Sequence, residues 1–321
     1  MSPVFQQSVL ITGSSGAFGQ AFVRYCLDNG ARRVVAFSRS ESKQAELRAA
    51  NMDPRVRWVL GDVRDQDRLT EACRGVDVVV HSAALKRVEV CADNPLEAIQ
   101  TNILGTANVA RACVASGVPR ACFLSTDKVA SPATLYGASK LVAERLWCGW
   151  NVYSAGTQTR FSATRYGNVA NSTGSVIPLW RKQAASGEVT ITDPRMTRFL
   201  MSMDDAVSLV ALALDQMRGG EVFLPKLQGA RMSELARAIA PGATQRITGI
   251  RQDEKLHEQL VDPEEVRRTW DCGSHYVIEP PERTWGTVEA PRGSLVDPYF
   301  TYSSDAKPYM SANELARMVG A

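Results

Sequence analysis

Tyr136 and Lys140, two residues whose side chains can exchange protons, lie four positions apart in a segment with a helical pattern of apolar residues. Tyr136 and Lys140 therefore share one face of the predicted helix. A lysine cation beside a tyrosine stabilises the phenolate and so brings the phenol toward use as a base. Because a lone Y-x-x-x-K pattern usually marks only a surface helix, this pair gains meaning from the residues that precede it.

Three polar residues follow directly after a short apolar segment, Ala121–Ser125, which is predicted to be a strand. They are Thr126, Asp127 and Lys128. The hydroxyl can donate a hydrogen bond to a reacting oxygen, the aspartic acid can deliver a proton, and a partly neutral lysine can remove one. A surface ion pair, worth only ~0–1 kcal/mol, is the simpler interpretation of the last two residues. Their position favours a functional role, because ligands of open α/β sheets bind outside the carboxyl ends of strands.

The elements that must hold these residues alternate along the first half of the chain. Segments rich in β-branched and aromatic residues are separated by segments of helical period. The strand-like segments are Ser8–Ile11, Arg33–Phe37, Val56–Leu60, Val76–Val80, Ala121–Ser125 and Phe161–Arg165. The helical segments are Ala17–Asn29, Ser42–Ala50, Asp65–Cys73, Pro95–Ser116 and Leu135–Trp150. This alternation predicts a Rossmann-type α/β fold, with a doubly wound parallel sheet between two layers of helices.

The first strand-to-helix turn contains three glycines, Gly13, Gly16 and Gly19, in the stretch TGSSGAFG. A glycine loop alone is a weak signal, because many turns need glycine for steric reasons. Here a strand precedes the loop and a helix follows it, which is the context of a dinucleotide-binding turn. The glycines would permit the turn, the approach of the pyrophosphate and the packing of helix on strand. The N-terminus of the helix would offer free N–H groups to the phosphates.

The second strand ends at Ser38 and Arg39 rather than at an acidic residue. A carboxylate there would accept a hydrogen bond from a ribose 2′-hydroxyl, whereas a serine and an arginine suit a 2′-phosphate. We therefore predict NADP as the cofactor. The alternative interpretation of Arg39 is a solvated surface arginine without a role in binding. Asp62, in GDV after the third strand, is a candidate adenine contact.

After Gly167 the chain changes to short segments separated by glycine and proline breaks, with a few short helices such as Met232–Ala240. This texture predicts a smaller C-terminal substrate-binding lobe that closes over the carboxyl edge of the sheet. We expect an NADP-binding domain over residues 1–166, rejoined by parts of 195–225, and a substrate lobe over most of 167–321.

Bulk properties restrict the class of protein. The net charge of +3 on 321 residues suggests neither nucleic acid nor an anionic membrane as a partner. No apolar run approaches the ~20 residues of a membrane span, and no signal peptide is visible, so we expect a cytoplasmic protein. The seven scattered cysteines are expected to be reduced. His81 and His257 are interpreted as structural, and no metal is assigned.

Eight stretches are characteristic when taken together: TGSSGAFG, FSRSESKQ, GDVRD, HSAALKRVEVCADNPLEAIQTNILGT, STDKVASPATLYGASK, RYGNV, ITDPRMTRF and EKLHEQLV. Through them nearly the whole chain resembles the extended short-chain dehydrogenase/reductase family. Within that family it is most similar to the UDP-N-acetylglucosamine 4,6-dehydratases, and among these to the inverting branch of pseudaminic acid synthesis. The Asp127-Lys128 pair is the motif that best separates these dehydratases from other members of the superfamily. Plain epimerases of this superfamily do not usually carry Asp-Lys there, and nucleoside-diphosphate-glucose dehydratases carry Asp-Glu.

The resemblance implies that UDP-N-acetylglucosamine is dehydrated to a UDP-4-keto-6-deoxy-N-acetylhexosamine, with inversion at carbon 5. Tyr136 would deprotonate the 4-hydroxyl while hydride leaves carbon 4 for NADP. Lys128, kept partly neutral by the charges of Lys140 and nicotinamide, would remove the proton at carbon 5, and Asp127 would protonate the departing 6-hydroxyl. Hydride would then return to carbon 6, so that a tightly bound NADP is recycled. The alternatives are a UDP-sugar 4- or 5-epimerase and a catalytically silent NADP-binding sensor.

The predicted site residues fall into three sets, and the resemblance also implies a homo-oligomer, a dimer or higher, with a UDP-sugar as substrate. Arginines suit a diphosphate, and a glutamate can accept from both hydroxyls of a ribose. The catalytic set is Thr126, Asp127, Lys128, Tyr136 and Lys140. The cofactor set is Gly13, Ser15, Gly16, Ala17, Phe18, Gly19, Ser38, Arg39, Asp62, Val63, Ala83, Ala84, Lys86, Tyr136 and Lys140. The substrate set is Lys86, Asn168, Arg198, Arg251 and Glu254, with the Asn102 region bordering the nicotinamide and the sugar.

The chain departs from the family pattern at three places. Val129 follows Asp-Lys where the family usually has alanine, and Thr173 stands where it usually has an arginine in S-R-G-S. Residues 251–255 read R-Q-D-E-K where the family often has R-P-G-E-K, so that Gln252 and Asp253 are the changed positions. The missing arginine and the extra carboxylate of Asp253 lower the positive charge expected near the diphosphate.

Overall fold

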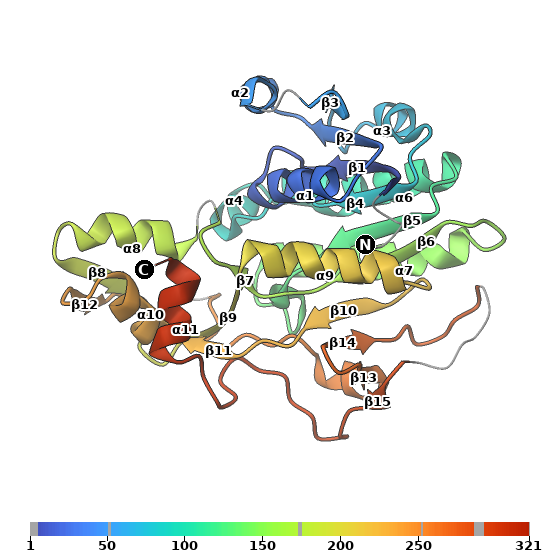
Figure 1. Cartoon of the computed structure of the whole chain (residues 1–321). Coiled ribbons are helices and arrows are strands. Elements are labelled where there is room, and N and C mark those ends of the chain that lie inside the picture. The colour runs from blue at the N-terminus through green and yellow to red at the C-terminus, as the bar shows by residue number, and fades with distance from the viewer. Residues whose placement is uncertain (1–5, 51–52, 173–174, 252, 286–291, 321) are drawn as a thin grey trace.

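The sheet that organises the molecule runs through its centre, with helices on both faces and a smaller lobe at one side (Figure 1). The computed structural model describes residues 6–50, 53–172, 175–251, 253–285 and 292–320. Within these residues ten strands form the sheet, in the order β3-β2-β1-β4-β5-β6-β10-β14-β13-β15. No helix in the described part of the chain has both the length and the apolar character needed to cross a membrane.

The first part of the sheet is parallel, and the direction of chain winding reverses between β1 and β4. Its strands are β1 (Ser8–Thr12), β2 (Arg33–Ser38), β3 (Val56–Leu60), β4 (Val78–His81), β5 (Arg120–Leu124) and β6 (Arg160–Thr164). A further parallel strand, β10 (Val222–Pro225), pairs with β6. Three antiparallel strands follow: β14 (His275–Ile278), β13 (Thr269–Asp271) and β15 (Ser294–Leu295).

The strands of the sheet are buried on both faces, which explains why their apolar runs do not alternate with polar residues. Val9 and Ile11 of β1 join the core under one helical layer, whereas Leu10 between them joins the core under the other. Val79 of β4 points to the same side as Leu10. Both layers therefore depend on the same short strands.

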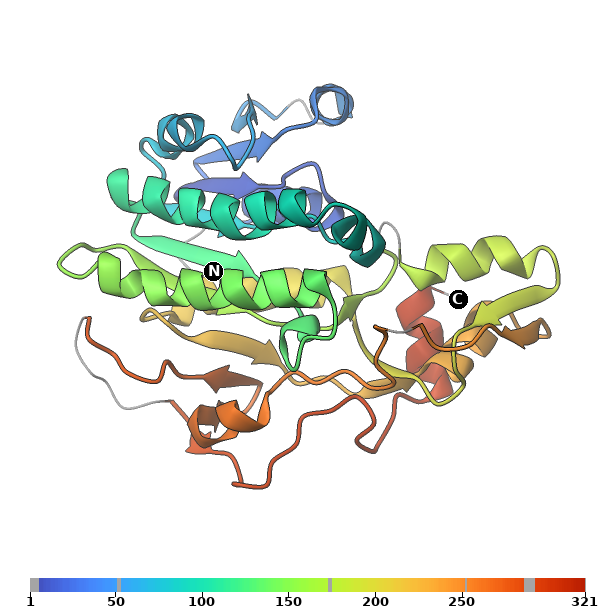
Figure 2. The same cartoon turned by 180° about the vertical axis from the view of Figure 1, so that it is seen from behind.

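The helices divide between the two faces. Figure 1 shows α1 (Ala17–Asp28) and α9 (Met203–Gln216) in front of the sheet. Figure 2 shows α6 (Gly105–Ala115) and α7 (Leu135–Tyr153) on the opposite face. The shorter helices of this part are α2 (Glu41–Ala50), α3 (Gln66–Cys73), α4 (Val88–Asp93) and α5 (Pro95–Ala98).

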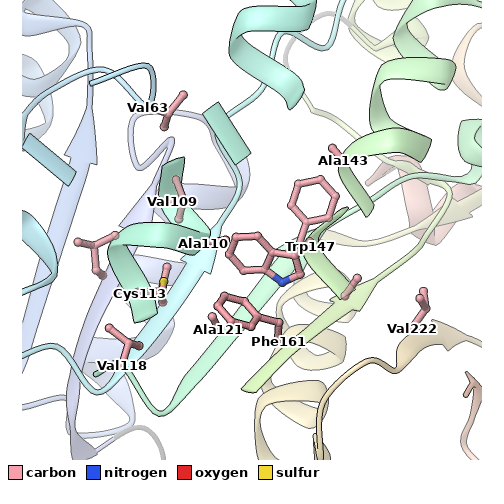
Figure 3. Packing of buried hydrophobic residues seen from close by; sticks show 14 of the residues in the cluster. Val63, Val109, Ala110, Cys113, Val118, Ala121, Ala143, Trp147, Phe161 and Val222 are labelled. Atoms are coloured by element: carbon pink, nitrogen blue, oxygen red, sulfur yellow. The ribbon is translucent and has the colours of Figure 1, made fainter. Parts of the chain in front are cut away.

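Trp147 anchors α7 to the sheet. Its side chain is fully buried, and Figure 3 shows it close to Ala110 of α6 and Phe161 of β6. The indole meets the Phe161 ring edge-on, with 5.1 Å between the ring centroids, and its Nε1–H donates to the carbonyl of Ser162 at 3.1 Å. The indole therefore satisfies its polar atom while filling apolar space, so α7 is fixed in position above β6.

A buried ion cluster makes a second connection to α7. Arg165, just after β6, has a fully buried side chain that pairs with Glu144 of α7 and with Glu265. Its guanidinium also donates to the carbonyl of Leu260 at 2.9 Å. Burial would raise the pKa of Glu265, but the Arg165 charge overcomes this and lowers it to about 2. The cluster thus ties α7 and β6 to the 3₁₀ turn Pro263–Arg268.

The smaller lobe follows β6 and has its own apolar core, which includes Ile177, Trp180, Leu235 and Leu315. Its strands are β7 (Asn168–Val169), β8 (Glu188–Ile191), β9 (Thr197–Met201), β11 (Gly229–Arg231) and β12 (Thr244–Ile247). Its helices are α8 (Val176–Ala184), α10 (Met232–Ile239) and α11 (Ala312–Val319). Figure 1 shows this lobe beside the carboxyl edge of the parallel strands.

The predicted fold class is confirmed. The structure adds helices that the sequence did not single out, such as α9, and it differs from the prediction in two further respects. The expected single helix Pro95–Ser116 contains a π-helical segment, Ile99–Leu104, between α5 and α6. Strands from β10 onward also extend the main sheet, although the sequence indicated no regular strands there. The division into a cofactor domain and a substrate lobe at residue 166 stays a prediction.

Replacing Gly19 by alanine should destabilise the protein by about 1–3 kcal/mol, although alanine is the better helix former. A Cβ atom at Gly19 would lie 2.5 Å from the carbonyl oxygen of Gly13, too close for the turn to keep its shape. Gly149→Ala is the matched control, since a Cβ atom there would meet nothing within 4 Å among the described residues beyond its own helix backbone, and we expect a gain of about 0.5–1 kcal/mol. Urea unfolding of both variants measures the difference. Equal stabilities of the two variants would contradict the steric argument.

Candidate active site

A cavity of about 550 Å³ lies at the carboxyl edge of the sheet, where the winding reverses between β1 and β4. Every residue of the predicted cofactor set lines this cavity, from Gly13 at the first turn to Lys140 in α7. Thr126 of the predicted catalytic set lines it as well. Residues far apart in the sequence are therefore brought together at the position that the doubly wound topology favours for ligands.

The glycine turn is shaped to admit a ligand. Gly13 has a positive φ of 70°, and a Cβ atom there would lie 2.9 Å from the backbone of Ala83. The N–H of Gly16 donates to the carbonyl of Gly13 at 2.9 Å, which closes the turn in front of α1. Side chains are thus kept out of the space before the helix N-terminus, and this arrangement fits the pyrophosphate of a dinucleotide.

Hydroxyl and basic groups gather at the end of β2. Ser38 is buried, and its hydroxyl accepts a hydrogen bond from Gln44 at 2.9 Å. The Arg39 side chain is 55% exposed and approaches Asp62 at 3.9 Å. Ser40 and Lys43 also line this part of the cavity. The region therefore combines positive charge with hydrogen-bond donors that a phosphate could use.

Tyr136 stands in the first turn of α7, where Thr134 caps the helix by accepting from the N–H of Gly137 at 3.0 Å. A Cβ atom at Gly137 would lie 2.4 Å from the carbonyl of Lys128, so glycine lets α7 pack on the catalytic loop. Burial raises the pKa of Tyr136 to about 12, against the opposing charge of Lys128 and a hydrogen bond with Thr126.

Lys140 has a different environment from the one that the sequence indicated. Its ammonium donates to the carbonyl of Leu124 at 2.6 Å and lies 3.8 Å from the ring centroid of Phe123. Burial lowers the pKa of Lys140 to about 7, against the attraction of Glu144. The cation whose charge lowers the Tyr136 pKa in this structure is Lys128, not Lys140.

Asp127 and Lys128 form a close pair next to Tyr136. Lys128 Nζ lies 2.9 Å from Asp127 Oδ1 and 3.4 Å from Glu258 Oε1. Thr126 donates to Asp127 Oδ1 at 3.0 Å. The Asp127 side chain is 1% exposed, and its Oδ2 atom has no hydrogen-bond partner among the described residues. Neither Asp127 nor Lys128 is among the residues that line the cavity, although Thr126 and Tyr136 beside them are.

In this structure the protein groups around Lys128 favour its charged form, and the partly neutral lysine expected beside a bound nicotinamide stays a prediction. Although burial opposes the charged form, the carboxylates of Asp127 and Glu258 raise the pKa of Lys128 above its ordinary value. The sequence could not reveal this, because Glu258 lies 130 positions farther along the chain.

The predicted substrate residues are only partly brought together. Arg198 is nearly buried and lies 3.5 Å from Glu254 and 3.8 Å from Glu258. It also donates to the carbonyls of Thr197, Lys255 and Leu256, so its guanidinium is largely engaged within the protein. Two oxygen atoms, Asn168 Oδ1 and Glu254 Oε2, are buried and have no hydrogen-bond partner among the described residues.

Two further positions complete the report on the substrate set. Arg251 is exposed, and Lys86 lines the cavity. The changed positions Thr173 and Gln252 lie outside the described residues, and Asp253 is exposed.

Several contacts at the site could not be singled out from the sequence. Ser125 and Tyr166 line the cavity beside Thr126, the first at the end of a predicted strand and the second directly after one. Asn102 is different, because the family resemblance implies that its region borders the site. It accepts from the N–H of Leu85 at 2.8 Å and donates to Ser139 at 3.0 Å, so it connects the loop after β4 to α7. Glu258 falls within EKLHEQLV, but no spacing rule relates it to Lys128.

Comparison with known proteins agrees with this geometry. A UDP-N-acetylglucosamine 4,6-dehydratase (inverting) from Campylobacter jejuni subsp. jejuni serotype O:2 is 40% identical over 325 residues, which cover 98% of this chain and 97% of the relative. A UDP-glucose 4-epimerase from Rickettsia canadensis is 40% identical over 281 residues, covering 85% of this chain and 82% of the relative. The resemblance inferred from the sequence motifs is confirmed by the first relative.

Solved structures are similar over the same extent. Pen from Bacillus thuringiensis has a TM-score of 0.89 at 31% identity, and the match covers 98% of this chain and 96% of that one. The dTDP-glucose 4,6-dehydratase DesIV from Streptomyces venezuelae, with NAD and TYD bound, has a TM-score of 0.73 at 24% identity and covers 98% and 96%, which supports the fold alone. The model of a family described as polysaccharide biosynthesis protein matches residues 9–280. With most of its length matched, the chain belongs to the polysaccharide biosynthesis protein family.

Proposed function

We propose that this protein is a UDP-N-acetylglucosamine 4,6-dehydratase that inverts carbon 5. The observation that carries the proposal is the buried Asp127–Lys128 contact of 2.9 Å beside Tyr136. Removal of water needs an acid and a base in addition to the group that handles the 4-hydroxyl, and this pair supplies both. The Campylobacter relative, at 40% identity over nearly the whole chain, supports the same activity.

The cavity is suited to NADP, which when bound supplies the chemistry of taking hydride from carbon 4 and returning it to carbon 6. The turn of Gly13, Gly16 and Gly19 would hold the pyrophosphate. Arg39 and Lys43 would face a 2′-phosphate, and a guanidinium can bind phosphate with two parallel hydrogen bonds. This choice of NADP over NAD rests on the basic residues after β2.

Tyr136 handles the first proton. Tyr136 lines the cavity, and so does Thr126, whose side chain hydrogen-bonds the phenol. As a phenolate, Tyr136 accepts the proton of the sugar 4-hydroxyl as carbon 4 becomes a ketone. The ketone makes the neighbouring C5–H bond acidic, which prepares the step carried out by the Asp127–Lys128 pair.

One proton transfer within the pair creates the two forms that elimination requires. When the Lys128 ammonium gives a proton to Asp127 across the 2.9 Å contact, a neutral amine and a carboxylic acid result. The amine takes the proton from carbon 5 as the C5–H bond breaks. The acid protonates the 6-hydroxyl as the C6–O bond breaks, so that water leaves and a C5=C6 double bond forms. Lys128 and Asp127 return to their ion pair. When hydride returns to carbon 6, carbon 5 takes the proton that Tyr136 accepted or one from solvent, on the face opposite to the one that lost its proton, which inverts the centre.

Assembly and location belong to the same proposal. Leu96, Ile99, Leu104 and Val142 are exposed apolar side chains on α5, the π-helical segment and α7, and they favour a homo-oligomer that covers these helices. All seven cysteines are unpaired thiols, which supports a reducing cytoplasmic location.

The proposal is tested by incubating the purified protein with UDP-N-acetylglucosamine in deuterium oxide, without added cofactor, and following the sugar by NMR and mass spectrometry. A dehydratase that retains NADP gives a 4-keto-6-deoxy product with deuterium at carbon 5, and the ring couplings report the inversion. The Rickettsia relative makes a 4-epimerase the second candidate, and an isomeric product that has lost no water would establish it instead.

Tyr136→Phe should lower turnover about 10²–10⁴-fold, because it removes only the hydroxyl that accepts the first proton. Tyr153→Phe, on the same helix with a side chain 76% exposed, is the matched control and should turn over like the wild type. Product formation by NMR and thermal unfolding of both variants measure the effect. A Tyr136→Phe enzyme with more than a tenth of wild-type turnover would contradict the assignment.

Arg39→Ala should weaken NADP binding about 10- to 100-fold and leave NAD binding nearly unchanged, because a charge-assisted contact to phosphate is worth about 1.5–3 kcal/mol. Arg48→Ala replaces an exposed arginine in the last turn of the neighbouring helix α2 and serves as the control. Calorimetric titration of cofactor-free protein gives the four dissociation constants. A parallel loss for NADP and NAD in Arg39→Ala would argue against a 2′-phosphate contact.

A further inference from the structure

We propose that Glu258 is a positioning residue for Lys128, whose carboxylate holds the amine against Asp127 and separates it from Arg198. The proposal rests on the dehydration proposed above and adds to it a residue that touches none of the reacting atoms.

The contacts of Glu258 place it between two cations. The residue is 4% exposed, and its Oε1 atom lies 3.4 Å from Lys128 Nζ and 3.8 Å from Arg198 Nε. Lys128 is in turn 2.9 Å from Asp127. Arg198 has a second carboxylate partner, Glu254, at 3.5 Å, so Glu258 is the carboxylate that Lys128 and Arg198 share.

The backbone of Glu258 is held by Ser304. Its N–H donates to Ser304 Oγ at 2.9 Å, and its carbonyl accepts from the N–H of Ser304 at 2.8 Å. The preceding residues are held as well, since the carbonyl of Leu256 accepts from Thr197 of β9 and Lys255 Nζ donates to the carbonyl of Ala130. Because Ala130 lies two residues after Lys128, Glu258 and Lys128 belong to segments that are tied together.

Lys128 needs such a partner. Its side chain is 28% exposed, so a flexible four-carbon stem has room to turn toward solvent. Loss of the Glu258 charge would also leave the Arg198 guanidinium to repel the Lys128 ammonium. Proton transfer between Lys128 and Asp127 requires their atoms to remain in contact, and this contact is what Glu258 preserves.

Glu258→Gln should therefore affect one step of the reaction more than the other. Oxidation at carbon 4 depends on Tyr136, on which Lys128 acts only through its charge, so NADPH formation should slow much less than elimination when NADP-loaded enzyme is mixed with UDP-N-acetylglucosamine. Elimination should be slowed about 10- to 100-fold, a part of what a positioned acid–base group contributes. NADPH should then accumulate, which its near-ultraviolet absorbance reports. Deuterium at carbon 5, followed by NMR, and loss of water, followed by mass spectrometry, should appear later than in the wild type. Glu258→Asp should recover part of the elimination rate.

A second measurement does not depend on turnover. The rate at which an amine-reactive reagent labels Lys128 in the NADP-loaded protein, read by peptide mass spectrometry, should rise in Glu258→Gln because the amine is released toward solvent. Glu264→Gln, whose side chain is 87% exposed and outside the site, is the matched control and should behave like the wild type in both measurements.

The inference is overturned if Lys128 labelling in Glu258→Gln equals that of the wild type, or if oxidation and elimination slow by the same factor. Thermal unfolding identifies a variant that has lost its fold, and Glu258→Asp then decides by the same two measurements. A wild-type enzyme that neither forms NADPH nor releases water would defeat the proposed function alone, since the labelling result still decides the role of Glu258.

Discussion

The arrangement of the site depends on the buried charge of Arg165. A guanidinium without solvent is tolerated only when carboxylates and carbonyls surround it, so Glu144, Glu265 and Leu260 must all reach the same point. These groups come from α7 and from the segment after residue 258, and α7 carries Lys140 one turn before Glu144 and Tyr136 in its first turn. Satisfying one buried cation therefore brings the C-terminal segment against the helix that holds the candidate base.

The same electrostatic rule operates on a smaller scale at the catalytic loop. Lys128 and Arg198 are cations that share Glu258, and Asp127 completes the group. The pair that would exchange protons is thus embedded in a set of charges supplied by β9 and the 254–258 segment. Lys140, by contrast, is directed to a backbone carbonyl and an aromatic ring, and burial lowers its pKa to about 7. Two lysines in one site are therefore given opposite tendencies by their surroundings.

Much of the sheet and the cavity could be predicted because the signals are local. The predicted strand Val76–Val80, the glycines at positions 13, 16 and 19, and the four-residue spacing of Tyr136 and Lys140 are all read within a short window. The charge state of Lys128 could not be predicted in this way, because it depends on Glu258 from a segment that only the fold brings near. The strands from Val222 onward were missed for a related reason: they are short, and the pairing of β10 with β6 and of β14 with β10 is decided by tertiary contacts.

The π-helical segment Ile99–Leu104 has a consequence for the phase of the helix that contains it. Each α-helical residue turns the chain by ~100°, so one additional residue in a wide turn rotates everything after it by about that angle. Before the wide turn is complete, Asn102 faces the loop of Leu85 and the start of α7, whereas Val109 and Cys113 beyond it face the core. In a regular α-helix of the same sequence, Asn102, Val109 and Cys113 would lie on one face, so they could not face the site and the core at the same time. The extra residue lets a single continuous helix present one face to the site and another to the sheet.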